Sequence, residues 1–147
     1  MMKSQKLYSL CYLLFLLICP FAFSQDSLST SVMTQQQAKI TEGDGWVFYE
    51  YFTADTYGTK NALTGMAIIQ PGKEIHPAHE HFEEEYLMLT QGSGVWTIEG
   101  KESDAKTGDI LYAAPWDSHG IKNTGDQPLV FVVMKWQSKG VPEPQSK

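Results

Sequence analysis

Apolar and polar residues along this chain alternate in short runs that are rich in β-branched and aromatic side chains. Six runs have the composition of β-strands, at residues 46–52, 65–70, 86–90, 95–99, 109–113 and 129–136. Turn-forming sequences separate them, such as Pro71-Gly72 and residues 91–94. Because no stretch shows helical periodicity over about ten residues, the pattern predicts an all-β domain, an antiparallel sandwich or barrel.

The last of these runs departs from alternation. Residues 129–134 are apolar without interruption, which is typical of a strand covered on both faces. A second sheet would cover the inner face and a subunit partner the outer face, so a homodimer is expected. A buried edge within one subunit is the alternative that the sequence leaves open.

The first 24 residues have the order of a secretory signal peptide. Lys3 and Lys6 precede an apolar run, and Ala22-Phe23-Ser24 offers a cleavage site before Gln25. The apolar run is about 12 residues long, short of the ~20 that span a bilayer, which disfavours a retained membrane anchor. Export to the periplasm or the medium is therefore expected, with lipidation of Cys19 as a weaker alternative.

The remaining chain is acidic and free of cysteine. Loss of the leader would remove Cys11 and Cys19, so disulfides are not expected in the mature domain. It would also remove Lys3 and Lys6, leaving nine of the 11 lysines against 17 acidic residues, and the chain contains no arginine. This balance argues against a nucleic-acid partner and leaves a small molecule as the expected one, with no membrane contact after cleavage.

Three of the four histidines lie in one ten-residue segment, HPAHEHFEEE, at residues 76–85. His79 and His81 are two residues apart, which places both side chains on one face of a strand. Glu85 could join them only if the chain turns in between, and His119 could approach from a distant segment. Three imidazoles and one carboxylate suit a single divalent transition-metal ion: Fe, Mn, Ni, Co, Cu or Zn. A solvated loop of surface histidines and glutamates is the alternative.

Two segments together resemble the sequence motifs of the cupin superfamily. In the first, Gly72 leads to His79-Glu-His81, then Glu85 after three residues and Gly92 after six more. In the second, Gly108 is followed by His119 and Asn123 at the family's spacing, with Ala114 in the usual proline place and Trp116 where a small residue is usual. The resemblance extends over residues 65–136.

This resemblance implies a double-stranded β-helix, the jelly-roll barrel of a small single-domain cupin, with one metal ion inside. The residues that match the family's metal ligands are His79, His81, Glu85 and His119. The expected organisation is a signal peptide at 1–24, an N-terminal linker or arm at 25–43, a cupin domain at 44–137 and a C-terminal tail at 138–147.

Four further residues are candidates for contact with a substrate. Asp117 could act as an acid or base and Tyr112 could donate a proton to a metal-bound oxygen, so both are predicted as catalytic. Trp116 could cap the pocket or stack on a sugar ring, and His76 could touch the substrate, so both are predicted as substrate-binding. Loop packing, turn capping and strand packing are the competing interpretations of these residues.

The leading hypothesis for function is an exported Lewis-acid enzyme of the isomerase, lyase or hydratase type, acting on a small hydroxylated or carbonyl substrate such as a sugar or uronate derivative. The alternatives are a metal-dependent dioxygenase and a non-enzymatic module that binds a sugar or small ligand. Without arginine, a substrate carboxylate would have to be bound by the metal or by one of three lysines, Lys60, Lys73 or Lys122.

Overall fold

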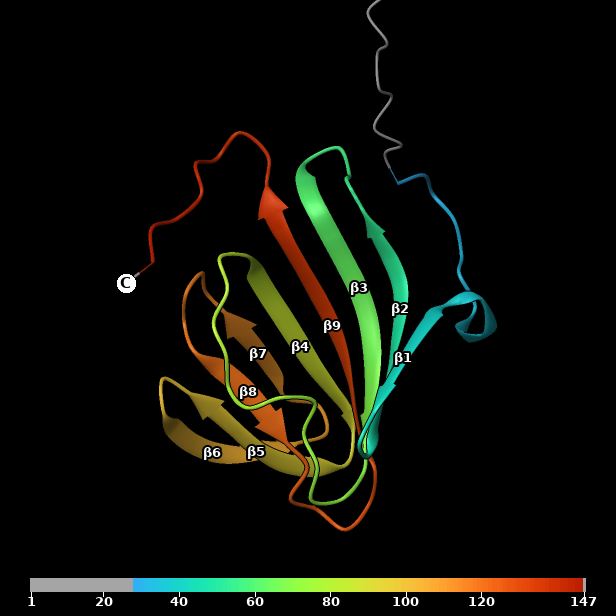
Figure 1. Cartoon of the computed structure of the whole chain (residues 1–147), viewed down its shortest axis with the longest axis vertical. Helices are drawn as coiled ribbons and strands as arrows, with labels where there is room; N and C mark the ends of the chain where they lie inside the picture. Colours follow the sequence, from blue (N-terminus) through green and yellow to red (C-terminus); the bar gives the residue numbers. More distant parts are fainter. Residues whose placement is uncertain (1–27, 147) are drawn as a thin grey trace, which may run out of the picture.

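Two antiparallel sheets make up the protein, and they enclose a single apolar core. The structure is a computed structural model that describes residues 28–146, so the predicted signal peptide and both cysteines lie outside the described residues. The larger sheet has the strand order β1-β2-β3-β9-β4-β7 and the smaller one the order β6-β5-β8. Figure 1 shows β9 between β3 and β4, with the small sheet lying beside β4 and β7. The predicted all-β, double-stranded β-helix fold is confirmed.

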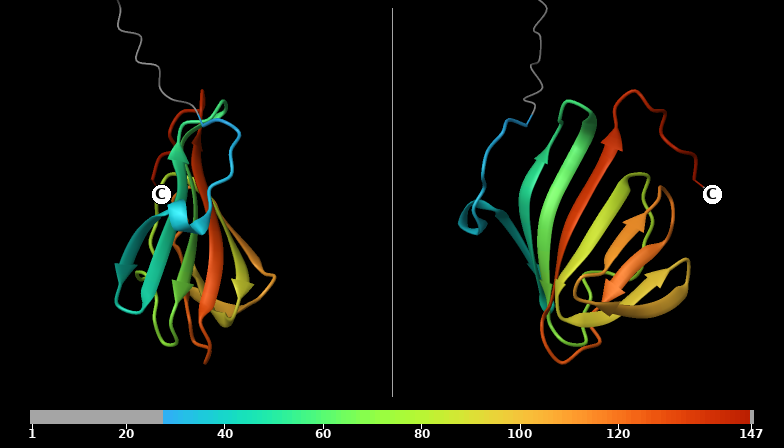
Figure 2. Two further views of the ribbon diagram at one scale, coloured as in Figure 1. Left: turned by 90° about the vertical axis from the view of Figure 1, so that its right-hand side faces the viewer. Right: turned by 180° about the vertical axis from the view of Figure 1, so that it is seen from behind.

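The strands follow one another with short connections, apart from one long loop at residues 70–83. Their bounds are β1 Lys39–Gly43, β2 Trp46–Ala54, β3 Thr59–Ile69, β4 Glu84–Gln91, β5 Ser93–Ile98, β6 Lys101–Lys106, β7 Ile110–Ala113, β8 His119–Lys122 and β9 Leu129–Ser138, after a 3-10 turn at Gln35–Gln37. Figure 2 shows that the long strands β3 and β9 extend beyond the small sheet. Within residues 28–146, no helix is long and apolar enough to cross a membrane.

The core lies between the two sheets and takes its buried residues from β3 to β9, with the partly buried Trp46 and Phe48 of β2 packed against them. Its buried members are Ala67, Ile69, Leu87, Leu89, Trp96, Ala105, Leu111, Ile121, Leu129, Phe131 and Val133. On β9 the buried residues are Leu129, Phe131 and Val133, whereas Met134 is 44% exposed. The apolar run at 129–134 therefore alternates between a buried and an outward face, as a strand requires.

The outer face of β4, β7 and β9 is apolar as well. Tyr86, Met88, Ile110, Tyr112 and Met134 are each between 37% and 60% exposed. The strand register places them side by side, with Tyr86 opposite both Tyr112 and Met134, and Met88 opposite Ile110. This face is the one that the predicted homodimer would cover.

The sequence pattern did not predict β6 and β8. β6 (KESDAK) has one buried residue, Ala105, and β8 (HGIK) has four residues including a glycine. Neither offers a long alternation of apolar and polar side chains, because charged residues occupy the exposed positions of β6 and β8 is too short. The part of the chain that was expected to form an N-terminal linker or arm contains β1, which pairs with β2 along its full length.

Candidate metal centre

Backbone hydrogen bonds join the long loop at residues 70–83 to β8 and to the residue that follows it. They bring the loop histidines close to His119. The backbone N–H and carbonyl of His79 exchange hydrogen bonds of 2.9 Å with those of His119. Further along, the amide of Gly72 donates to the Asn123 carbonyl and the amide of Asn123 donates to the Lys73 carbonyl, both at 2.9 Å. A single β-bridge rather than a continuous strand thus aligns His79 with His119.

Gly120 allows this close approach. A Cβ atom at position 120 would lie 2.9 Å from the Ala78 Cα, inside ordinary van der Waals contact. Ala78 directly precedes His79, so a larger residue at 120 would displace the loop that carries this histidine. Glycine at position 120 is therefore needed for the loop to place His79 beside His119.

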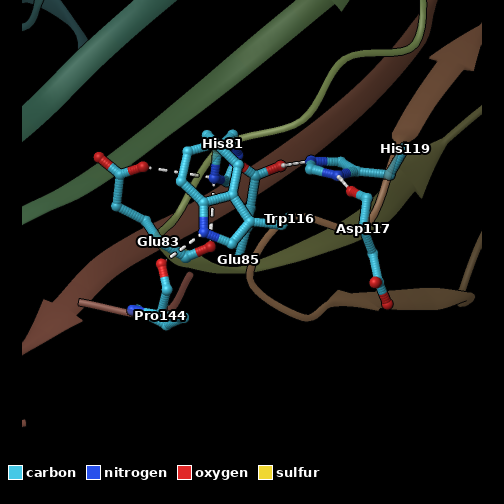
Figure 3. Close-up of polar contacts among 7 residues, drawn as sticks. All are labelled: His81, Glu83, Glu85, Trp116, Asp117, His119 and Pro144. Atoms are coloured by element: carbon cyan, nitrogen blue, oxygen red, sulfur yellow. Dashed lines mark hydrogen bonds and ion pairs between the residues drawn. The ribbon is translucent and has the colours of Figure 1, made fainter. Parts of the chain in front are cut away.

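Four side chains converge between the sheets, and we call His79, His81, Glu85 and His119 the ligand cluster. One nitrogen from each histidine lies within 4.8 Å of the others. The Glu85 oxygens reach two of them, with Oε1 3.2 Å from His119 Nε2 and Oε2 3.3 Å from His81 Nε2. Figure 3 shows Glu85 between these two rings. Glu85 and His119 are buried, and His79 and His81 are partly buried.

Backbone carbonyls determine which ring nitrogen faces the centre of the cluster. His119 Nδ1–H donates to the Asp117 carbonyl at 2.8 Å, and His81 Nδ1–H donates to the Glu83 carbonyl at 3.1 Å. Because a carbonyl oxygen only accepts, each Nδ1 carries a proton, and in the neutral ring Nε2 presents a lone pair. Both lone pairs face the Glu85 carboxylate, which is also an acceptor.

The histidine lone pairs and the Glu85 carboxylate oxygens repel one another at these distances. A positive charge between them would remove this repulsion. His79 Nδ1 and His81 Nε2 are buried and have no hydrogen-bond partner among residues 28–146, since the 3.3 Å approach of Glu85 to His81 lacks hydrogen-bond geometry. Such orphaned nitrogens are costly in a structural core. A cation at this point would bind all of them, and three imidazoles with one carboxylate fit a borderline transition-metal ion.

The pKa values of the cluster follow from burial and from these contacts. Burial lowers the pKa of His79 to about 4, so this ring is neutral near pH 7 and able to bind a metal. For Glu85, burial opposes ionisation, but His119 and His81 outweigh it and lower its pKa to about 2. For His119, burial again opposes the charged form, but Glu85 and the Asp117 carbonyl raise its pKa overall. Protonation of His119 and metal binding are therefore competing ways to satisfy the Glu85 carboxylate.

His81 is supported from two further sides. The Glu83 carboxylate lies 3.3 Å from His81 Nδ1, and the Trp116 amide donates to the His81 carbonyl at 2.8 Å. The Glu83 side chain is only 15% exposed and contacts the ring, so it is not a solvated loop residue. A carboxylate that supports a ligand from behind holds the ring's orientation and increases its basicity.

The ligand cluster opens into a cavity of about 280 Å³ between the sheets. Most of its lining is apolar, from Trp46, Phe48, Leu63, Ile69, Ile75, Leu87, Ile121, Phe131 and Val133. The polar lining comes from Thr41, His76, His79, Glu85, His119 and Lys135. Except for Thr41, these polar residues are members of the cluster or its close neighbours, so the cavity has one polar end.

The structure brings one of the four predicted substrate contacts to the cavity. His76 lines it, with its ring centroid 4.1 Å from that of His79. Asp117 lies beside the cluster and contacts it through its backbone carbonyl, which holds His119. Trp116 is not part of the cavity lining. Its ring centroid is 6.3 Å from that of Phe82. Its indole N–H donates to the Pro144 carbonyl at 2.7 Å, a contact that Figure 3 shows.

Tyr112 is not brought to the cluster. It lies on the outer face of the large sheet, 47% exposed, where its hydroxyl donates to Glu84 at 2.9 Å. The contact with this carboxylate raises the pKa of Tyr112. Its position on β7 explains the difference, because Leu111 and Ala113 on either side of it are the buried residues.

The lysines that were expected to bind a substrate carboxylate are not part of the cavity lining either. Lys73 pairs with Asp44 at 2.6 Å, and Lys60 and Lys122 are exposed. Lys135, which sequence reasoning missed, is the lysine in the cavity wall. Trp46 on β2 also lines the cavity.

Comparison with known proteins places these features in context. The profile of the "Cupin domain" family matches residues 65–135. The oxalate-binding protein of Thermotoga maritima is 34% identical over 109 residues, covering 72% of this chain and 88% of that protein. Gentisate 1,2 dioxygenase 1 of Aquipseudomonas alcaligenes is 25% identical over 113 residues, which cover 76% of this chain but only 30% of the dioxygenase.

Similarity to solved structures covers a comparable share of the chain. The crystal structure of an RmlC-like cupin from Shewanella frigidimarina superposes with a TM-score of 0.61, at 14% sequence identity, over 76% of this chain and 95% of the other. At this identity the likeness concerns the fold, and the site must be judged from its own residues.

Proposed function

This chain belongs to the cupin family, and we propose that it is a metal-dependent enzyme whose ligand cluster holds one transition-metal ion at the end of the cavity. The observation that carries the proposal is the pair of orphaned, buried nitrogens on His79 and His81 beside an ionised Glu85. The substrate is a small hydroxylated or carbonyl compound. Export to the periplasm or medium remains a prediction from the leader sequence.

The bound ion supplies Lewis acidity toward a carbonyl or hydroxyl oxygen, as an isomerase, lyase or hydratase requires. The chain's own groups prepare the site for it. The carbonyls of Asp117 and Glu83 hold His119 and His81 in the tautomer that directs Nε2 toward the centre. Glu85 contributes a negative charge, and the apolar walls limit the access of water to the reacting end of the substrate.

Metal content tests this proposal directly. The protein is purified anaerobically, without chelator or metal-affinity resin, beside a variant with His81→Ala and His119→Ala. About one transition-metal ion per chain in the parent and almost none in the variant supports the proposal. His76→Ala is the matched control, because this histidine lies beside the cluster without belonging to it and should leave the metal content unchanged. Absence of metal from the parent, even after reconstitution, would refute the proposal.

A dioxygenase is the second candidate, favoured by the similarity to a gentisate 1,2-dioxygenase and by the apolar lining of the cavity. Iron at the ligand cluster, together with oxygen consumption that begins when substrate is added, would replace the Lewis-acid proposal with this one. Manganese, nickel or zinc, with turnover but no oxygen uptake, supports the Lewis-acid proposal.

A binding module is the third candidate, and the likeness to an oxalate-binding protein supports it. Tight ligand binding without turnover would favour this function over either enzyme.

For the subunit arrangement we propose a homodimer, in which a second copy covers the exposed apolar face of β4, β7 and β9. The continuity of that face across three paired strands supports this arrangement.

A further inference from the structure

We propose that Lys135 makes the cavity selective for anions, so that its ligand is a small carboxylic acid with an apolar body. The carboxylate would lie between Lys135 and the ligand cluster, and the apolar body against the cavity wall. This inference deepens the proposed function and rests on it, because the same ligand would be held at the metal ion.

The position of Lys135 is the first argument. Lys135 on β9 is the direct cross-strand partner of Glu85 on β4. Partners in an antiparallel pair have their Cβ atoms about 5 Å apart on the same face of the sheet, so both side chains leave the sheet toward the same space. Both line the cavity.

The second argument is that Lys135 lacks a counter-ion. The Glu85 oxygens are directed at His119 and His81, at 3.2 and 3.3 Å. In the part of the chain that the structure describes, no carboxylate forms an ion pair with the Lys135 ammonium, although the side chain is partly buried. A partly desolvated charge without a partner is unfavourable, and an anionic ligand would remove that cost.

Two other charged residues of limited exposure form ion pairs within residues 28–146, whereas Lys135 forms none. Lys73 pairs with Asp44 at 2.6 Å, and the buried Asp55 is 3.4 Å from Lys139. Lys135 is also the lysine that lines the cavity, while Lys60 and Lys122 are exposed. The cavity thus contains one ammonium group that the folded chain leaves available.

The third argument is the division of the cavity into two parts. The polar end is lined by three members of the ligand cluster, His79, Glu85 and His119, together with His76 and Lys135. The remainder is lined by aromatic and aliphatic side chains, among them Trp46, Phe48 and Phe131. A free sugar would place hydroxyl groups against this apolar wall, where they would lose hydrogen bonds to water without replacement. A molecule with an anionic head and an apolar body matches both parts.

An internal role for Lys135 is the competing explanation. In that case the lysine only balances the charge of Glu85 across the sheet, and its removal would affect metal binding or folding but not the choice of ligand. The two explanations therefore predict different affinities of the Lys135→Met variant for charged and uncharged ligands of the same shape.

The experiment measures binding of benzoate and 2-hydroxybenzoate, each beside its uncharged amide, to the cobalt-loaded protein by calorimetry. The visible spectrum of the cobalt ion and the tryptophan fluorescence provide independent readouts, because Trp46, one of the four tryptophans, lines the cavity. We expect the acids to bind more tightly than the amides. In Lys135→Met the acids should lose about tenfold to a hundredfold in affinity, as for a lost hydrogen bond to a charged group, while the amides are unaffected.

Two variants complete the design. Lys135→Arg keeps the charge and should retain the preference for acids. Lys122→Met removes an exposed lysine from β8 and should bind all four compounds like the parent.

The inference is overturned if Lys135→Met binds the acids as tightly as the parent, if it loses acids and amides equally, or if the parent binds none of the four compounds or shows no preference for the acids. Metal content, measured on each preparation, reports on the proposed function separately. If the protein retained no metal but still bound benzoate through Lys135, the proposed function would fail and the anion site would stand.

Discussion

Glu85 and Lys135 face each other across β4 and β9, yet the carboxylate is engaged by His119 and His81 and not by the lysine. Opposite charges at directly paired positions usually form an ion pair. Here the two side chains form no ion pair: the Glu85 carboxylate contacts the histidines of the ligand cluster, and the Lys135 side chain lines the cavity. This division of charge is the basis of both proposals.

Metal removal should destabilise the protein. An ion that binds only the folded chain stabilises it by about 2.7 kcal/mol when its free concentration is 100 times the dissociation constant. Thermal unfolding with and without added zinc or manganese should therefore show a higher melting temperature with metal. The variant carrying His81→Ala and His119→Ala should show no such dependence. A melting temperature of the parent that is unchanged by metal would contradict the assignment of the ligand cluster.

Gly120→Ala should weaken metal binding without touching a ligand. The new Cβ would lie 2.9 Å from the Ala78 Cα and would displace the loop that carries His79. We expect a loss of about tenfold to a hundredfold in metal affinity, as for changes in the residues that support metal ligands. Competition against a chromophoric chelator measures it. Gly58→Ala is the control, because a Cβ there meets nothing within 4 Å, and equal losses in the two variants would refute the explanation.

Asn123→Ala should destabilise the fold. The Asn123 side chain is fully buried, its amide donates to the carbonyls of Ile69 and Gln127, and its Oδ1 accepts from the Gly125 amide. Truncation leaves these three groups without partners, at a cost of about 2–4 kcal/mol in the free energy of unfolding. Urea denaturation measures this loss. The exposed Gln91→Ala should change stability by less than about 0.5 kcal/mol.

Asp55 should make stability depend on pH in the acid range. The amide of Asn61, opposed by burial and assisted by Lys139, lowers the pKa of this carboxyl. A lowered pKa in the folded state means that the ionised group stabilises the protein above its unfolded pKa, near 4, and that this contribution disappears as the pH falls through the folded pKa. The stability difference between the parent and Asp55→Asn should therefore be greatest near neutral pH and shrink below about pH 4.

Lys139→Met gives a second measure of the same contact. It should produce a smaller difference with the same trend, because the Asn61 amide, the largest influence that lowers the pKa, is retained. A difference for Asp55→Asn that grows toward low pH would reverse the sign and contradict this account.

The exposed apolar face of the large sheet should mediate dimer formation. Met88 and Ile110 are direct neighbours on this face, 42% and 60% exposed. Sedimentation velocity should give a dimer for the parent and a monomer for Met88→Lys with Ile110→Lys. Ile40→Lys, which alters an equally exposed apolar residue on β1, should remain a dimer. A parent protein that sediments as a monomer would remove the homodimer proposal.

Motif spacing was enough to predict the fold and to select the four residues that the structure brings together in the ligand cluster. It could not predict Lys135, although Leu129, Phe131, Val133 and Lys135 share one parity along β9. The uninterrupted apolar run hid the alternation that would have shown which parity faces inward. Nor could it place Trp116, whose φ of 65° directs the chain into a region that non-glycine residues seldom adopt.

Local composition also failed at β6, where five of six residues are exposed. Such a strand forms because β5 pairs with it along its whole length, a tertiary cause that leaves little trace in its own residues. The supporting role of Glu83 was equally hidden, because a glutamate two residues after a histidine carries no signal of its own in the sequence.

The contact between Pro144 and Trp116 has a practical consequence for anyone who purifies this protein. Pro144 belongs to the segment after β9, and the tryptophan that it holds donates its own amide to the carbonyl of His81. A polyhistidine tag fused after this segment would bring foreign imidazoles close to the loop that carries His81. Metal analyses on such a fusion would count ions on the tag together with any ion in the ligand cluster, so the affinity handle should be removable or placed on the N-terminal side of the domain.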